Sequence, residues 1–164
     1  MAYIAVTDLF SRFGVEELAQ LSDRGVPRTV TPELLSAAAA GADMSAWSAT
    51  DVEAVSQALA TISQAIADAC SAIDGYLAGR YGVPLADPPP AVRRMACDMA
   101  RYFLYDDGAT EIVEKRYTGA IAYFRDVSSG KVTLGPVVES APAAGGLVEM
   151  VSATPVFGRR ERGM

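Results

Sequence analysis

The feature that most constrains the fold of this chain is a long row of large apolar residues in its first half. The row extends over about thirty residues, or roughly 45 Å at 1.5 Å per residue. Thr50, followed three positions later by Glu53, has the pattern of a capping box and predicts where the helix starts. Alanines between the large residues allow other helices to approach closely, either within one bundle or from a neighbouring subunit. The members of the row recur at spacings of three, four or seven positions, the period of one helix face: Val52, Val55, Leu59, Ile62, Ile66, Ile73 and Leu77.

The stretch from residue 73 to residue 107 predicts a helical hairpin. Gly79 or Gly82 can take the left-handed conformation that closes a helix, and Pro84 follows where a helix cannot continue. A run of prolines then fixes an extended approach, and Pro90 suits the first turn of a second helix. In that second helix the apolar residues fall on one side. The arginines that we expect it to expose are Arg93, Arg94 and Arg101.

Shorter segments complete a mainly α-helical fold, a small bundle built on the long amphipathic helix. Apolar spacing and capping residues predict helices over residues 7–14, 15–21, 31–41 and 110–128, with Thr7 capping the first. After residue 130 the composition shifts to Gly, Pro, Val and Ser, and the helical period ends. We expect residues 1–130 to form the helical body and residues 131–164 an extended arm. Within the arm, Val132-Thr133-Leu134 and residues 147–151 could pair as a short β-hairpin.

The sequence carries few signs of an enzyme. The chain has no histidine, the commonest general base and metal ligand, and no Walker loop or dinucleotide fingerprint. Cys70 and Cys97 lie inside predicted helices, where buried free thiols are a more natural interpretation than a disulfide or a reactive thiol. Asp107 or Thr110 is expected to cap the following helix rather than to join Asp106 in a metal site. We therefore expect no enzyme activity, no cofactor and no metal.

A series of short motifs is spread over roughly residues 1–26 and 71–135. They include Thr7-Asp8-Leu9, Arg12-Phe13-Gly14, Ile73-Asp74-Gly75-Tyr76-Leu77, Gly79-Arg80-Tyr81, Arg93-Arg94-Met95-Ala96-Cys97-Asp98, Arg101-Tyr102, Leu104-Tyr105-Asp106-Asp107, Arg116-Tyr117 and Gly130-Lys131-Val132. In order and spacing they resemble the neck protein family of Mu-like phages and prophages. The resemblance implies a small, mostly helical head–tail connector that forms a ring, a dodecamer, beneath the portal in the virion neck. Residues 27–50 depart from the family, because an Ala-rich insertion replaces a short acidic turn.

The resemblance also implies the partners and the surfaces that meet them. Neck proteins of this kind end in an aromatic-plus-arginine tail, so we expect docking on the portal protein through Val156, Phe157, Arg159, Arg160 and Arg162. A frayed basic terminus with no partner is the alternative. Other copies of the chain, and a downstream stopper or tail protein, are the remaining expected partners. The candidates for contacts between copies are Arg93, Arg94, Arg101, Tyr76 and Arg80.

The formal net charge of −6 disfavours wrapping of nucleic acid, because duplex binding needs cations against the phosphates. In a ring, the same sign would let phage DNA pass through the lumen without sticking. No secretion signal or membrane span is expected, and assembly is expected in the host bacterial cytoplasm. Two other functions stay open. A stopper or tail-terminator protein would usually be rich in β-structure, and a small helical DNA-binding regulator would need Arg93, Arg94 and Arg101 on a recognition helix.

Overall fold

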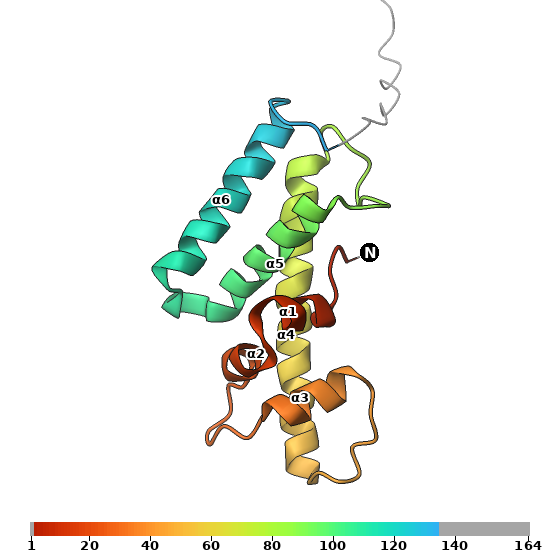
Figure 1. Cartoon of the computed structure of the whole chain (residues 1–164), viewed down its shortest axis with the longest axis vertical. Coiled ribbons are helices and arrows are strands. Elements are labelled where there is room, and N and C mark those ends of the chain that lie inside the picture. Colours follow the sequence, from red (N-terminus) through yellow and green to blue (C-terminus); the bar gives the residue numbers. More distant parts are fainter. Residues whose placement is uncertain (1, 135–164) are drawn as a thin grey trace, which may run out of the picture.

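The computed structural model describes residues 2–134, without the side chain of Asp107. This part of the chain folds into helices and contains no β-strand, which confirms the mainly α-helical prediction. Figure 1 shows them arranged around one long helix, α4. In chain order the elements are α1 (Val6–Phe13), α2 (Val15–Ser22), α3 (Pro32–Ala39), α4 (Ala49–Leu77), α5 (Pro90–Tyr105), the 3-10 turn η1 (Asp106–Gly108) and α6 (Glu111–Ser128). None of the described helices combines the length and the apolar character that crossing a membrane requires.

The predicted apolar row forms the buried side of α4, a helix of 29 residues. Val52 and Leu59, at the edges of the row, are half-buried. Small buried residues, Ala65 and Ala69 on α4 and Ala96 on α5, permit the close approach of the two helices that form the predicted hairpin. The buried residues of α4 are Val55, Ala58, Ile62, Ala65, Ile66, Ala69, Cys70, Ile73 and Leu77. Spacing alone therefore located the core side of this helix.

The N-terminal segment is fixed to one flank of α4. The Tyr3 backbone N–H donates to the Cys70 sulfur at 3.3 Å, and the Tyr3 hydroxyl donates to the Asp74 carboxylate. The same hydroxyl accepts the backbone N–H of Leu85 at 3.2 Å, which ties down the connection between α4 and α5. Burial and the Asp74 hydrogen bond together raise the pKa of Tyr3. Ile4, which follows, lies in the hydrophobic core.

Two of the predicted helix starts are wrong by one or two residues. α4 begins after Ser48, whose hydroxyl accepts the backbone N–H of Asp51 at 3.2 Å, so Thr50 lies inside the first turn. α1 begins at Val6, where the Asp8 carboxylate accepts the N–H of Ala5 at 2.7 Å, and Thr7 is likewise inside the helix. In both cases the helix starts earlier than predicted, because a side-chain oxygen other than the predicted threonine hydroxyl accepts an N–H group at the start of the helix.

Residues 27–50 contribute to the core rather than forming an appended loop. Thr31 caps α3 as predicted, accepting the N–H of Leu34 at 3.2 Å. Leu34 and Leu35 are buried where α3 packs against α2 and α4. Trp47 is half-buried and packs against the core. The segment is therefore part of the body.

The body continues slightly past the end of α6. Val132 and Leu134 pack against the core, and the Leu134 N–H donates to the Tyr81 hydroxyl at 3.0 Å. The prediction of a strand at Val132-Thr133-Leu134 is therefore wrong, since these residues are not in a strand and the Leu134 N–H is hydrogen-bonded to a side chain. Its proposed partner at residues 147–151 lies outside the described residues.

Candidate functional site

The candidate contact residues at the start of α5 are free to meet a partner. Arg93 and Arg94 are both exposed. Arg93 makes a loose ion pair with Asp87 at 3.7 Å and donates to the Pro88 carbonyl at 3.2 Å. Arg94 takes part in no ion pair or side-chain hydrogen bond within residues 2–134. The expected exposure of these two side chains is confirmed.

The other three candidates are engaged inside the chain. Arg101 was expected to be exposed, but its side chain is 15% exposed and its Nε lies 2.6 Å from a Glu17 carboxylate oxygen. Arg80 donates to the Val127 carbonyl at 2.7 Å and so satisfies the C-terminal end of α6. Tyr76 stacks against the ring of Phe124 with centroids 6.5 Å apart. The role of these residues in contacts between copies stays a prediction, while their role inside the body is visible.

A first cleft, called here the arginine cleft, opens between the N-terminal segment with α1 and the start of α5. Its volume is about 350 Å³. One wall is built by Arg12, which contacts both Asp98 carboxylate oxygens at 3.2 Å and so holds α1 against α5. The lining combines cations with a small apolar floor and consists of Ile4, Asp8, Ser11, Arg12, Arg93, Arg94 and Cys97. A carboxylate with a short apolar stem would suit this combination of charge and shape.

The cysteine in the arginine cleft is not poised for chemistry. Cys97 is buried and free, as is Cys70 on α4, which confirms the prediction of buried free thiols. Burial raises the pKa of Cys97 to about 11, although the nearby Arg12 guanidinium acts in the opposite direction. At neutral pH the side chain is therefore a thiol and not a thiolate nucleophile.

A second cleft, called here the α4 cleft, lies where the C-terminal end of α5 meets α4. Its volume is about 490 Å³. Asp68 is exposed at this cleft and accepts the side-chain amide of Gln64 at 2.8 Å. Arg24 on the rim pairs with Asp106 at 3.4 Å. The lining residues are Arg24, Ala60, Thr61, Gln64, Ala65, Asp68, Phe103 and Leu104. The floor is apolar, and the carboxylate of Asp68 makes no ion pair within the described part.

The exposed face of α4 beside this cleft has an unusual composition. The whole helix contains no lysine or arginine, and the exposed residues between Glu53 and Gly75 are short or polar. Those residues are Ser56, Gln57, Ala60, Ser63, Gln64, Ala67, Asp68 and Ser71. A face without bulky side chains lets another backbone approach closely. It offers carboxylates and no cation, whereas the arginine cleft combines Arg12, Arg93 and Arg94 with the single carboxylate of Asp8.

The buried carboxylate in the loop between α2 and α3 has a structural role. Asp23 accepts backbone N–H groups from Gly25, Thr29 and Val30 at 2.7 to 2.9 Å. Burial by itself would raise the pKa of Asp23, but these three hydrogen bonds outweigh it and lower the pKa. The described residues contain no cluster of His, Cys, Asp or Glu side chains arranged to hold a metal ion.

The expected portal-contact residues lie outside the part of the chain that the structure describes. They are Val156, Phe157, Arg159, Arg160 and Arg162, and their role stays a prediction. Conversely, sequence reasoning missed Asp68 and Arg12. Asp68 could have been found, because it is a carboxylate on the polar side of a helix that has no cation. Arg12 could not, because its partner Asp98 is 86 positions away.

Comparisons with known proteins agree with the motifs in the sequence. A family described as Bacteriophage Mu, Gp36 matches residues 3–152. Gene product J of Escherichia phage Mu is 37% identical over 108 residues, which cover 63% of this chain and 75% of that protein. The Mu-like prophage FluMu protein gp36 of Haemophilus influenzae is 38% identical over 112 residues, 65% of this chain and 77% of that protein. The matches confirm the resemblance to Mu-like phage proteins and support a phage structural or morphogenesis protein.

Proposed function

Because this chain belongs to the Bacteriophage Mu Gp36 family of Mu-like phage proteins, we propose that it is a head–tail connector subunit. In this role it is a structural protein of the virion neck. Its copies form a closed ring below the portal protein, join the capsid to the tail and let DNA pass through the lumen. Assembly takes place in the host bacterial cytoplasm. The protein acts by fitting against its partners and not as an enzyme.

The observation that best supports a ring is the presence of two unlike surfaces on one small body. The arginine cleft presents Arg94, which has no ion pair within residues 2–134, whereas the α4 cleft presents Asp68 on a helix that has no cation. A closed ring needs a heterologous contact, in which one surface of each copy meets a different surface of the next. A two-fold dimer would instead need one self-complementary surface. Opposite charges on separate surfaces fit the first arrangement.

The arm is the proposed link to the portal. The described body ends at Leu134, which is held by the Tyr81 hydroxyl. The chain that follows, residues 135–164, has a maximal extended reach of roughly 100 Å. That length allows the segment with Phe157 and Arg159 to contact a protein above the ring. Many identical contacts in one ring would add their strengths even where each is weak.

A genetic test comes first. The gene is disrupted in the phage or prophage that encodes this chain, and the particles are examined by electron microscopy. We expect separate heads and tails, and normal particles when the intact gene is supplied in trans. Tailed, infectious particles without this protein would refute the proposal.

Imaging of the assembled neck distinguishes the proposed connector role from the alternative functions. A ring of this chain in direct contact with the portal supports the connector role. A ring placed further down the neck would identify a stopper or tail terminator instead. Salt-dependent binding to duplex DNA, with no copy of the chain in the particle, would favour the regulator.

Deletion of residues 154–164 tests the arm. The helical body should keep its circular dichroism spectrum and its melting temperature, because its helices and its hydrophobic core are formed by residues 3–134. Head–tail joining should be lost. Normal joining by the truncated protein would show that the arm is not the link to the portal.

A further inference from the structure

We propose that neighbouring copies in the ring meet through Arg94 of the arginine cleft on one copy and Asp68 of the α4 cleft on the next. The ring axis then runs along α4. This inference rests on the proposed function, because it specifies how the copies of the connector contact one another. It follows from the sides, the heights and the charges of the two clefts.

The two clefts lie on opposite flanks of α4. Tyr3, next to Ile4 of the arginine cleft, is hydrogen-bonded to Cys70, so this cleft is on the Cys70 side of the helix. Asp68 is two residues earlier, and at about 100° per residue its side chain points roughly 200° away from that of Cys70. Figure 1 agrees, since the N-terminal segment lies on one side of α4 and the end of α5 with η1 lies on the other. Copies placed side by side would bring the unlike clefts together.

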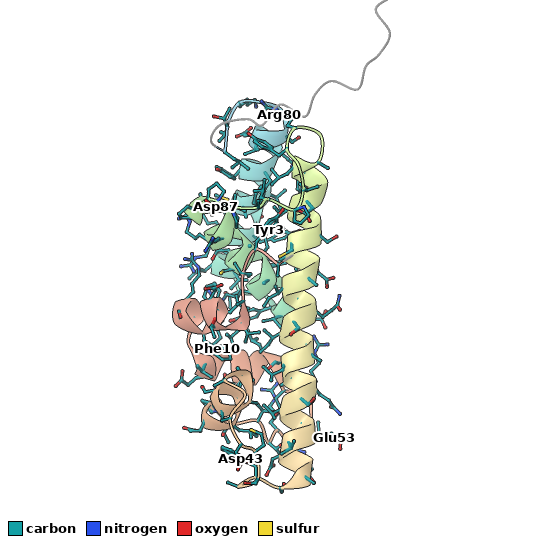
Figure 2. The ribbon with its side chains drawn as sticks, turned by 90° about the vertical axis from the view of Figure 1, so that its right-hand side faces the viewer. Tyr3, Phe10, Asp43, Glu53, Arg80 and Asp87 are labelled. Carbon is teal, nitrogen blue, oxygen red and sulfur yellow. The ribbon has the colours of Figure 1, made fainter. Side chains whose placement is uncertain are left out.

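Asp68, at the upper end of the α4 cleft, lies at nearly the height of Cys70, which marks the N-terminal wall of the arginine cleft. Copies in a closed ring are related by rotation without translation, so two surfaces that meet must be level along the ring axis. Cys70 and Asp68 differ by about 3 Å along the helix at 1.5 Å per residue. Glu53, the other exposed carboxylate of this face, is about 25 Å below Cys70 by the same measure. Figure 2 shows Tyr3 beside the upper half of α4 and Glu53 near its lower end. With the ring axis along α4, Asp68 and not Glu53 is therefore level with the N-terminal wall of the arginine cleft.

The charges and the local packing complete the match. Arg94 and Asp68 are both exposed, and neither has an ion pair in the described part. The α4 cleft has room for an arginine side chain, and its floor of Phe103 and Leu104 can cover the aliphatic stem. Short residues beside Asp68, such as Ala67 and Ser71, let the start of α5 of the neighbour approach. One such pair would form at every joint of the ring.

Charge reversal tests the pair in full-length protein. The variants Arg94→Glu and Asp68→Arg are supplied in trans to the phage with the disrupted gene, singly and together. Each single reversal places like charges at every joint, and we expect the yield of tailed particles to fall by about 100-fold or more. The double variant restores opposite charges, so its yield should return to within about fivefold of the intact protein. Melting temperatures of the purified variants confirm that each one folds.

Two matched variants serve as controls. Arg116→Glu reverses another exposed arginine, on α6 and away from both clefts, and should leave the particle yield unchanged. Glu53→Arg reverses a carboxylate on the same face of α4 and should not rescue Arg94→Glu, because it lies at the wrong height. Normal yield with Arg94→Glu, or rescue by Glu53→Arg instead of Asp68→Arg, would overturn this contact. Either result leaves the connector role intact, whereas particles that need no copy of the protein would remove the proposed function itself.

Discussion

The two ends of α5 place the same type of residue in opposite situations. At the C-terminal end, Arg101 is paired with Glu17 at 2.6 Å and lies over the ring of Phe13, with 4.6 Å from the guanidinium carbon to the ring centroid. Tyr105 donates its hydroxyl to the same Glu17 oxygen at 3.0 Å. At the N-terminal end, Arg93 and Arg94 are exposed and Arg94 has no ion pair in residues 2–134. One end therefore holds α1 and α2 to the bundle, and the other presents charge at the surface.

This difference separates the arginine of α5 that stabilises the body from the arginines of α5 that are available to a partner. Arg101 is surrounded by an acid, an aromatic ring and a phenol from the same chain, so its charge is already compensated. The side chain of Arg94 is exposed, and it makes no ion pair with the described part of the chain. Because Glu17 already pairs with Arg101 inside the body, this arginine is not available to contact DNA. This weakens the interpretation of the protein as a DNA-binding regulator. Stability and assembly should therefore respond to different arginines.

The largest effect on stability is expected from Arg101→Ala. The change leaves Glu17 half-buried without its cation and removes the contact over Phe13, so unfolding should become easier by about 2–3 kcal/mol. At roughly 3–4 °C per kcal/mol for a body of this size, the melting temperature should fall by about 6–12 °C. Thermal unfolding followed by circular dichroism measures it. Arg101→Lys, which keeps the charge but not the planar stacking, should lose about half as much. If Arg101→Ala melted together with the intact protein, the two ends of α5 would not differ as described.

A slightly smaller loss is expected in the middle of α5, where Asp98 meets Arg12. Asp98 is buried with 8% exposure, and the pair joins α1 to α5. Arg12→Ala should cost about 2 kcal/mol, because it leaves a buried carboxylate without its cation. A double-mutant cycle with Asp98→Ala should give a coupling energy of about 1–2 kcal/mol. Coupling close to zero would mean that the contact, at 3.2 Å to each oxygen, does not help to hold the two helices together.

These pairs mark the limit of what the sequence could predict. The buried side of α4 and the extent of α6 follow from periodicity, since a 3.6-residue period is a local property, and the hairpin follows from the glycines and prolines between residues 79 and 90. Arg101 was expected to be exposed because its neighbours in sequence do not include Glu17, which is 84 positions away. The start of α4 was misplaced because Thr50-x-x-Glu53 fits a capping box as well as the Ser48 hydroxyl does. Which oxygen reaches the free N–H depends on how residues 40–48 pack. The clefts required the arrangement of α1, α4 and α5 in space.

The loop between α2 and α3 provides a comparison outside α5, because its contribution to stability should depend on pH. The folded state lowers the pKa of Asp23, so its contribution to stability is present above the unfolded value of about 3.9 and is lost as the pH falls below it. Asp23→Asn cannot accept three N–H groups equally well and should cost about 1–2 kcal/mol at pH 7. The gap between the two proteins should narrow as the pH falls from 5 towards 2.5, measured by urea unfolding at each pH. A constant gap would mean that the charge of Asp23 has no part in holding the loop.

The smallest effect on stability is expected at the other end of α5. Arg94→Ala removes an exposed side chain with no ion pair in the described residues, so the free energy of unfolding should change by less than about 0.5 kcal/mol. Its melting temperature should stay within about 2 °C of the intact protein, well apart from Arg101→Ala in the same experiment. A loss above about 1 kcal/mol would mean that Arg94 supports the fold through contacts within the body. In that case, failed assembly of Arg94→Glu could no longer be attributed to the surface between copies. An unchanged melting temperature is thus the result that makes the charge-reversal experiment interpretable, because it leaves the contact with a partner as the property that the substitution alters.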